Sequence, residues 1–186
     1  MKNSVIPIQV FGVIPTNRGC AVFLGNKEKT FTIYVENSVG QAIAMFMQST
    51  PKERPLTHDL IGHIFQALGV SVERVLINDL KDGTYFARLI LKQDNELGRK
   101  LIEIDARPSD SIALAVQAKA PLFVSKAVME QVEDMSEVLK KLNEMQNSPP
   151  PDAEGESDSA PPSLNPDLDE PEPEDDEGPP PGKGKK

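Results

Sequence analysis

The chain has 186 residues and a formal net charge of −9 at pH 7, from 29 acidic and 20 basic residues. This length accommodates one domain with an appendage. No stretch approaches the ~20 apolar residues of a membrane-spanning helix, and the single cysteine, Cys20, excludes an internal disulfide. We therefore expect a soluble, cytoplasmic protein without membrane association, in which Cys20 is a small buried side chain.

The negative charge is concentrated at residues 148–186. This segment contains twelve Asp and Glu residues, three Lys residues and eleven of the 17 prolines, but four apolar residues. Residues 1–147 are consequently neutral. So little apolar surface cannot offset the conformational entropy of folding. We predict a folded domain at residues 1–132, a C-terminal helical extension at 133–147 and a disordered, acidic, Pro-rich tail at 148–186.

Alternating apolar residues predict three strands in the first part of the chain. They span residues 5–14, 20–24 and 30–35, and the polar residues 25–29 form a hairpin loop between the second and third. Pro7 lacks a backbone N–H, which predicts an edge position or a strand start for the first strand.

Two helices are predicted next. Ser38, with Gln41 three residues later, indicates a capping box at the start of the first. Thr57 is the expected N-cap of the second helix, and Gly69 ends it. Apolar residues at helical spacing predict the buried faces, which are Val39, Ala42, Ile43, Phe46 and Met47 in the first helix and Leu60, Ile61, Ile64, Phe65 and Leu68 in the second.

The second part of the chain repeats this order. Strands at residues 70–80 and 84–92 form a hairpin closed by Asp82 and Gly83, a strong turn signal. A polar loop at 93–98 leads to another strand at 101–105. The remaining predicted elements are a helix beginning at Pro108, a short strand at 121–124, and a last helix that begins at Ser125 and carries Val128, Val132, Met135, Leu139 and Leu142 on one seam.

Each half of this order places strands before helices. The pattern is typical of an α+β fold, with helices packed on a mostly antiparallel sheet and two related strand-then-helix halves. A proline-bearing edge strand and the apolar seam of the last helix would leave apolar surface exposed. We therefore expect a homo-oligomer.

The junction at residues 104–110 is the candidate site. Asp105 ends a strand with alternating polarity and shares its polar face with Glu103, whereas Asp110 lies in the first helical turn after Pro108. Backbone N–H groups and Arg107 would meet an anion there, beside carboxylates that suit a hard metal. The alternative is a well-capped helix with a structural aspartate.

The run from Ile104 to Ala115, followed by residues 120–125, resembles the signature of the bifunctional nuclease domain family. A second block at residues 54–60 and 80–87 agrees in order and spacing, and the resemblance covers roughly residues 3–132. It implies a metal-dependent nuclease that hydrolyses phosphodiester bonds of DNA, RNA or both, with Mg²⁺ or Mn²⁺ as the cofactor.

The resemblance also assigns roles to six residues. They are His58, Asp59, Asp105 and Asp110 for catalysis, the last two also as metal ligands, and Arg107 with Ser109 for binding phosphate. The chain departs from the family pattern before the first helix, where Glu36 replaces a glycine and Val39 replaces an acid. Val39 and the neutral charge of residues 1–147 keep two alternatives open. One is a non-catalytic oligomeric module that binds a phosphorylated ligand or protein partner, and the other is a structural protein whose acidic tail contacts basic partners.

Overall fold

The structure is a computed structural model that describes residues 4–96 and 98–147. The predicted tail at 148–186 lies outside the described residues. The strands are β1 (Val5–Thr16), β2 (Gly19–Gly25), β3 (Thr30–Val35), β4 (Val70–Lys81), β5 (Thr84–Asn95), β6 (Gly98–Ala106) and β7 (Leu122–Ser125). The helices are α1 (Asn37–Gln48), α2 (Thr57–Ala67), α3 (Pro108–Ala118), α4 (Lys126–Gln131) and α5 (Ser136–Asn147). None of the described helices is both long and apolar enough to span a membrane.

The seven strands form one sheet in the order β3-β2-β1-β7-β4-β5-β6. All neighbours are antiparallel except β4 and β7, which run parallel. The predicted α+β fold with a mostly antiparallel sheet is therefore confirmed.

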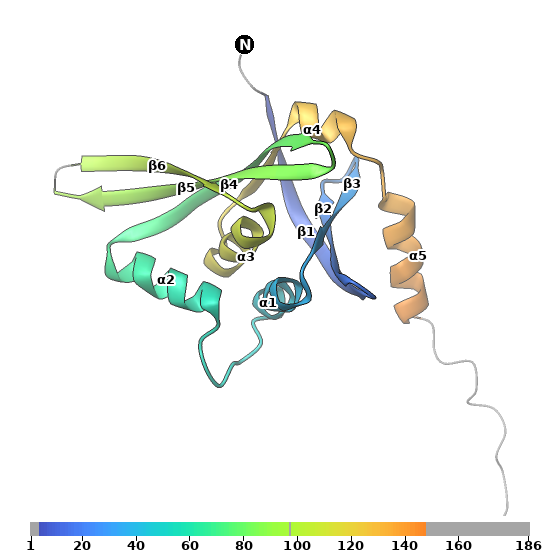
Figure 1. Cartoon of the computed structure of the whole chain (residues 1–186), viewed down its shortest axis with the longest axis horizontal. Coiled ribbons are helices and arrows are strands. Elements are labelled where there is room, and N and C mark those ends of the chain that lie inside the picture. The colour runs from blue at the N-terminus through green and yellow to red at the C-terminus, as the bar shows by residue number, and fades with distance from the viewer. Residues whose placement is uncertain (1–3, 97, 148–186) are drawn as a thin grey trace, which may run out of the picture. The chain divides into compact units, whose positions relative to one another are not determined.

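The sheet consists of two halves with the same order of elements. The antiparallel strands β1–β3 lead into α1, and the antiparallel strands β4–β6 lead into α3. The short strand β7 joins the halves, because it pairs with β1 on one side and β4 on the other. Helices α1 and α3 pack against each other and against the sheet (Figure 1). Their N-caps, Glu36 and Arg107, consequently lie next to each other.

The core lies between this helix pair and the sheet. Leu24, Ile43, Ile77 and Ile112 are fully buried in it. Helix α1 approaches β2 very closely at Gly40, where a Cβ atom would lie 2.3 Å from the Cβ of Cys20. The burial predicted for Cys20 is confirmed, since its side chain is buried beneath α1 at Gly40.

The hairpin turn and the start of α3 are as predicted. Asp82 and Gly83 both have positive φ, 49° and 76°, as a two-residue hairpin turn requires. Pro108 is the first residue of α3. The predicted polar loop at 93–98 is wrong, because β5 continues to Asn95 and pairs with a β6 that begins at Gly98.

The N-cap predicted for α1, Ser38, is two residues too late. The helix begins at Asn37 with Glu36 as its N-cap, and no capping box forms between Ser38 and Gln41. The Gln41 amide instead donates to Asn37 Oδ1 at 3.4 Å.

The start of α2 is displaced in the same way. Thr57 is its first helical residue and Leu56 is the N-cap. The Asp59 carboxylate reaches back to accept from the Leu56 N–H at 2.8 Å, so a side chain inside the first turn does the capping expected of Thr57.

The buried face predicted for α2 is partly wrong. Ile61 and Phe65 pack against the core, but Leu60, Ile64 and Leu68 are 56%, 46% and 63% exposed. Helix α2 touches α3 and β4 along one side, so its second apolar stripe faces solvent. In α1, Met47 is likewise exposed.

Of the two positions that Pro7 predicted, the edge position is wrong, since β1 lies between β2 and β7, but Pro7 does lie near the start of the strand, which begins at Val5. Residues 5–8 of β1 pair with β7, and pairing with β2 begins only at Gln9. Pro7 therefore occupies a stretch with one neighbouring strand, where a missing N–H is tolerated.

The predicted last helix is two helices. Ser125 caps α4 as expected, with its hydroxyl accepting from the Val128 N–H at 3.2 Å. After α4 the chain is held to β3, since the Met135 N–H donates to the Thr30 carbonyl at 2.7 Å. Helix α5 then begins at Ser136, whose N–H donates to Asp134 Oδ1. The predicted continuous apolar seam does not form, since Val128 is buried in the core.

Candidate functional site

Four polar side chains meet where the first turns of α1, α2 and α3 converge. His58 Nε2 lies 3.4 Å from Asp110 Oδ1, and Arg107 Nε donates to Asp110 Oδ2 at 2.8 Å. On its other side, Arg107 Nη1 lies 3.6 Å from Glu36 Oε1. We call Glu36, His58, Arg107 and Asp110 the Asp110 cluster. The fold brings them together from three separate segments of the chain.

The cluster has a fixed, buried end and an open end. His58 is 7% exposed, and its ring meets the edge of Phe46 in a T-shaped contact with centroids 6.4 Å apart. Arg107 is largely exposed at the other end. An open depression of about 500 Å³ lies over the cluster, and Val39, Leu56 and Ile61 supply its apolar wall. A ligand in this depression would meet all four cluster side chains.

The electrostatics of the cluster keep Arg107 cationic. Its hydrogen bond to Asp110, the charge of Asp110 and the nearby charge of Glu36 raise the pKa of Arg107 above its ordinary value. A planar guanidinium at the start of a helix is well suited to the oxygens of a phosphate.

The pairing of His58 with Asp110 is suited to proton transfer. When Nε2 carries the proton, it donates to Asp110, and Nδ1 retains the lone pair of a base. A carboxylate in this position orients the imidazole and stabilises the cation that forms when the ring takes up a proton.

Asp59 is next to His58 in the chain but faces a different set of partners. Its Oδ1 accepts from Lys52 Nζ at 2.7 Å and from Gln117 Nε2 at 2.8 Å, and its Oδ2 accepts from the Leu56 N–H at 2.8 Å. Burial opposes ionisation, but the hydrogen bond from Lys52 and those from Leu56 and Gln117 outweigh it and lower the pKa of Asp59. Asp59 thus joins α2 to α3 and to the preceding loop, and does not enter the cluster.

Asp105 also lies apart from the cluster. It is paired across the strands with Arg88, with Oδ1 3.3 Å from Nη1, and it is exposed. Arg88 also pairs with Glu103, so the two acids of β6 share one face. The adjacent Ala106 lies opposite the fully buried Ala87, on the other face of the sheet. The structure therefore does not bring Asp105 and Asp110 together.

Ser109 lies on the far side of Arg107 from His58. It lines a second open depression, of about 390 Å³, together with Tyr34 and Tyr85. Arg107, Glu36 and Val39 line both depressions, so they form the ridge between them.

The donor atoms of the cluster limit which metal ions they suit. The described part of the chain contains no group of three or more His, Cys, Asp or Glu side chains that could hold a metal ion. Two carboxylates, Glu36 and Asp110, flank Arg107. Mg²⁺ needs only one or two protein carboxylates, because waters and substrate phosphates complete its shell. The donor set fits such an ion and does not fit a zinc site, which needs three or four protein ligands.

Glu36 is the cluster residue that sequence reasoning did not assign to the site. Its signal was its position just before the first helix, where it departs from the family pattern. Val39, the apolar replacement for the family acid, lines the same depression as Glu36. The depression therefore has a carboxylate, that of Glu36, which lies three residues before Val39 in the chain.

Comparison with known proteins identifies a family. The bifunctional nuclease domain matches residues 22–137. An uncharacterized protein of Mycobacterium tuberculosis is 40% identical over 106 residues, which are 57% of this chain and 60% of that relative. A protein of Oryza sativa subsp. japonica named bifunctional nuclease 1 is 30% identical over 76 residues, 40% of this chain and 22% of its own length.

The chain thus spans well under two thirds of the lengths of these relatives. The family match covers more than half of the chain and includes every residue of the Asp110 cluster, from Glu36 to Asp110. The chain belongs to the bifunctional nuclease domain family.

Proposed function

We propose that this protein hydrolyses phosphodiester bonds of nucleic acid at the Asp110 cluster. The observation that carries the proposal is the contact chain from His58 through Asp110 to Arg107, with a half-open depression above it. It combines a base, an acid that orients the base, and a cation for phosphate. The family membership supports the same reaction class.

Each cluster residue has a role in this reaction. His58 takes the proton of the attacking water, and Asp110 holds the imidazole in place and stabilises its positive form. Arg107 binds the phosphate oxygens and stabilises the charge that develops on them, together with the free backbone N–H groups in the first turn of α3.

A divalent cation such as Mg²⁺ or Mn²⁺ would, when bound, polarise the phosphoryl oxygen and lower the pKa of bound water. Asp110 is the carboxylate that would hold it, with Glu36 as the second candidate ligand on the other side of Arg107.

The test is a cleavage assay on labelled DNA and RNA with Mg²⁺, with Mn²⁺ and with EDTA. We expect His58→Ala and Asp110→Asn each to reduce the rate by roughly 10²–10⁴-fold, the typical contribution of a general acid or base. Arg107→Lys should raise KM for the substrate, because a lysine cannot form the two-pronged contact. Asp94→Asn is the matched control, since this acid pairs with Lys92 near the end of the β5–β6 hairpin.

Asp105→Asn decides between the two acids of the junction. Its carboxylate pairs with Arg88 on the other face of the sheet, so we expect at most a few-fold loss of activity. If Asp105→Asn reduces the cleavage rate as much as Asp110→Asn does, Asp105 takes part in the reaction. The alternative is a non-catalytic binding module, which the neutral charge of residues 1–147 keeps open. This alternative would be favoured if the wild-type protein binds inorganic phosphate but cleaves no substrate under any of the three conditions.

A further inference from the structure

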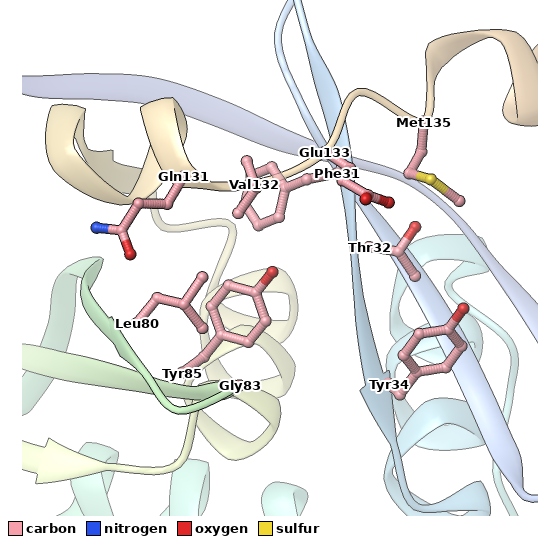
Figure 2. A pocket seen from close by; sticks show the side chains of 10 residues that line it. All are labelled: Phe31, Thr32, Tyr34, Leu80, Gly83, Tyr85, Gln131, Val132, Glu133 and Met135. Carbon is pink, nitrogen blue, oxygen red and sulfur yellow. The ribbon is translucent and has the colours of Figure 1, made fainter.

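A groove leads from the Asp110 cluster along the edge strand β3. The sheet curls so that β3 faces the β4–β5 hairpin, and the rings of Phe31 and Tyr85 stack across the gap with centroids 6.2 Å apart. An open depression of about 330 Å³ lies between these two elements. Figure 2 shows the side chains that line it. Tyr34, Gly83 and Tyr85 line both this depression and the one beside Arg107. The two depressions adjoin each other at these shared residues, and we call them together the tyrosine groove.

The two tyrosines of the chain both line this groove, Tyr85 from the hairpin and Tyr34 from β3, where the Tyr34 ring extends away from Tyr85 (Figure 2). Tyr34 is 73% exposed, a large aromatic surface to leave in water. Tyr85 is half-buried, and burial raises the pKa of its phenol. The groove thus offers one open aromatic face and one neutral phenol.

Exposed Tyr34 stands between two arginines that come from distant parts of the chain. Arg107 lines the groove on the side of the Asp110 cluster. Arg18, in the turn between β1 and β2, lines a further depression of about 550 Å³ that also has Tyr34 and Val35 in its wall. An aromatic face flanked by cations is the arrangement that binds a base and its neighbouring phosphates.

The exposed aromatic face indicates which nucleic acid fits, since single strands and duplexes both need cations along the backbone. Stacking on a tyrosine requires a base that is unpaired and exposed. A groove with one open aromatic face and a cation on each side therefore suits a single strand.

We propose that the tyrosine groove binds single-stranded nucleic acid, with one base stacked on Tyr34 and the adjoining phosphates at Arg18 and Arg107. From there the strand would cross the ridge formed by Glu36, Val39 and Arg107 to reach the Asp110 cluster. This inference rests on the proposed function, because it names single-stranded nucleic acid as the substrate that the Asp110 cluster would cleave.

The composition of the chain provides a direct reporter. The chain has no tryptophan and only the two groove tyrosines, so its intrinsic fluorescence comes from Tyr34 and Tyr85 alone. We expect a 12-nucleotide single strand to quench this emission in EDTA buffer. Affinity is measured in parallel by fluorescence anisotropy of a labelled strand, with a duplex of the same sequence and an abasic single strand of the same length as comparison ligands.

Three variants assign the binding to the ring of Tyr34. Tyr34→Ala should weaken binding by about 5- to 100-fold, the range of a lost stacking contact. Tyr34→Phe should stay within about twofold of wild type, because it keeps the ring. Phe86→Leu is the aromatic control, since Phe86 is exposed at the neighbouring position of β5 and therefore points to the other face. Thermal melts confirm that each variant is folded.

The expected result is that the single strand binds best, and that the abasic strand binds wild type as weakly as the normal strand binds Tyr34→Ala. Equal affinity of wild type and Tyr34→Ala, an abasic strand that binds as well as the normal one, or tighter binding of the duplex would each overturn the proposal. Binding that needs Tyr34 in a protein without cleavage activity would refute only the proposed function. Cleavage of single strands that is unchanged in Tyr34→Ala would refute only the groove.

Discussion

At the scale of single residues, His58 and Asp59 show how adjacent side chains acquire different tasks. Successive residues on a helix point about 100° apart, so His58 faces Asp110 while Asp59 faces Lys52 and Gln117. The block that contains both residues therefore combines a member of the Asp110 cluster with the residue that anchors its helix to Lys52 and Gln117.

Asp59→Asn should reduce stability rather than remove a reacting group. It weakens charge-assisted hydrogen bonds from Lys52, Leu56 and Gln117, and bonds of this type contribute about 1.5–3 kcal/mol. We expect urea denaturation at pH 7 to show a loss of about 1–3 kcal/mol. Asp94→Asn is the control, since this exposed acid pairs with Lys92 near the end of the β5–β6 hairpin, and its midpoint should match that of wild type.

The effect of Asp59→Asn should depend on pH in one direction. The pKa of Asp59 in the folded state is below its ordinary value of 3.8, so its contribution is complete above that value and is lost as the pH falls through the folded pKa. The difference between wild type and variant should accordingly shrink in denaturation curves recorded from pH 5 down to pH 3. A difference that grows on acidification would show that the carboxylate is not the stabilising form.

At the scale of elements, the site depends on how closely α1 lies against β2. Gly40 allows this approach, because any Cβ there would collide with Cys20, 2.3 Å from its Cβ and 2.5 Å from its Sγ. Helix α1 carries Glu36 at its N-cap, so its position sets the distance from Glu36 to Arg107. A packing contact inside the core thereby determines the geometry of a surface cluster.

Gly40→Ala should therefore affect both stability and the site. Overpacking of this kind costs about 1–3 kcal/mol, and we expect a loss of that size by thermal denaturation together with reduced cleavage. Gly12→Ala in β1 is the matched control, because nothing lies within 4 Å of a Cβ at that position. Unchanged stability of Gly40→Ala would mean that α1 can move away from β2 without cost.

At the scale of the whole molecule, exposed apolar residues of α2 and its C-cap form a stripe on the surface. Leu60, Ile64 and Leu68 recur every fourth residue and are all exposed. Ile61 and Phe65 of the same helix already serve the core. Contiguous exposed apolar surface on a soluble protein is typical of an interaction site.

We expect the protein to self-associate through this stripe. Light scattering coupled to size exclusion should show a dimer or larger species for wild type and a monomer for the double variant Leu60→Lys, Leu68→Lys. Val138→Lys on α5 is the control, since Val138 is also exposed but lies on a different helix. If only Val138→Lys dissociates the protein, the interface involves α5 instead, and a monomeric wild type would refute self-association.

The sequence by itself determined the fold class, the family and the order of the elements as far as β7. Alternation places residues of one strand on fixed faces, so the shared face of Glu103 and Asp105 was predictable and both now pair with Arg88. The turn at Asp82 and Gly83 and the start of α3 at Pro108 were predictable for the same local reason, because backbone geometry restricts which residues fit there.

Only the tertiary structure decided which of the predicted site residues meet. His58 and Asp110 are 52 positions apart, and their contact depends on the packing of α2 against α3. Asp105 and Asp110 are close in sequence, yet Asp105 belongs to one face of the sheet and Asp110 to a helix that packs on the other. Periodicity assigns a side chain to a face of its own element, but the curl of the sheet and the packing of the helices determine which faces come together.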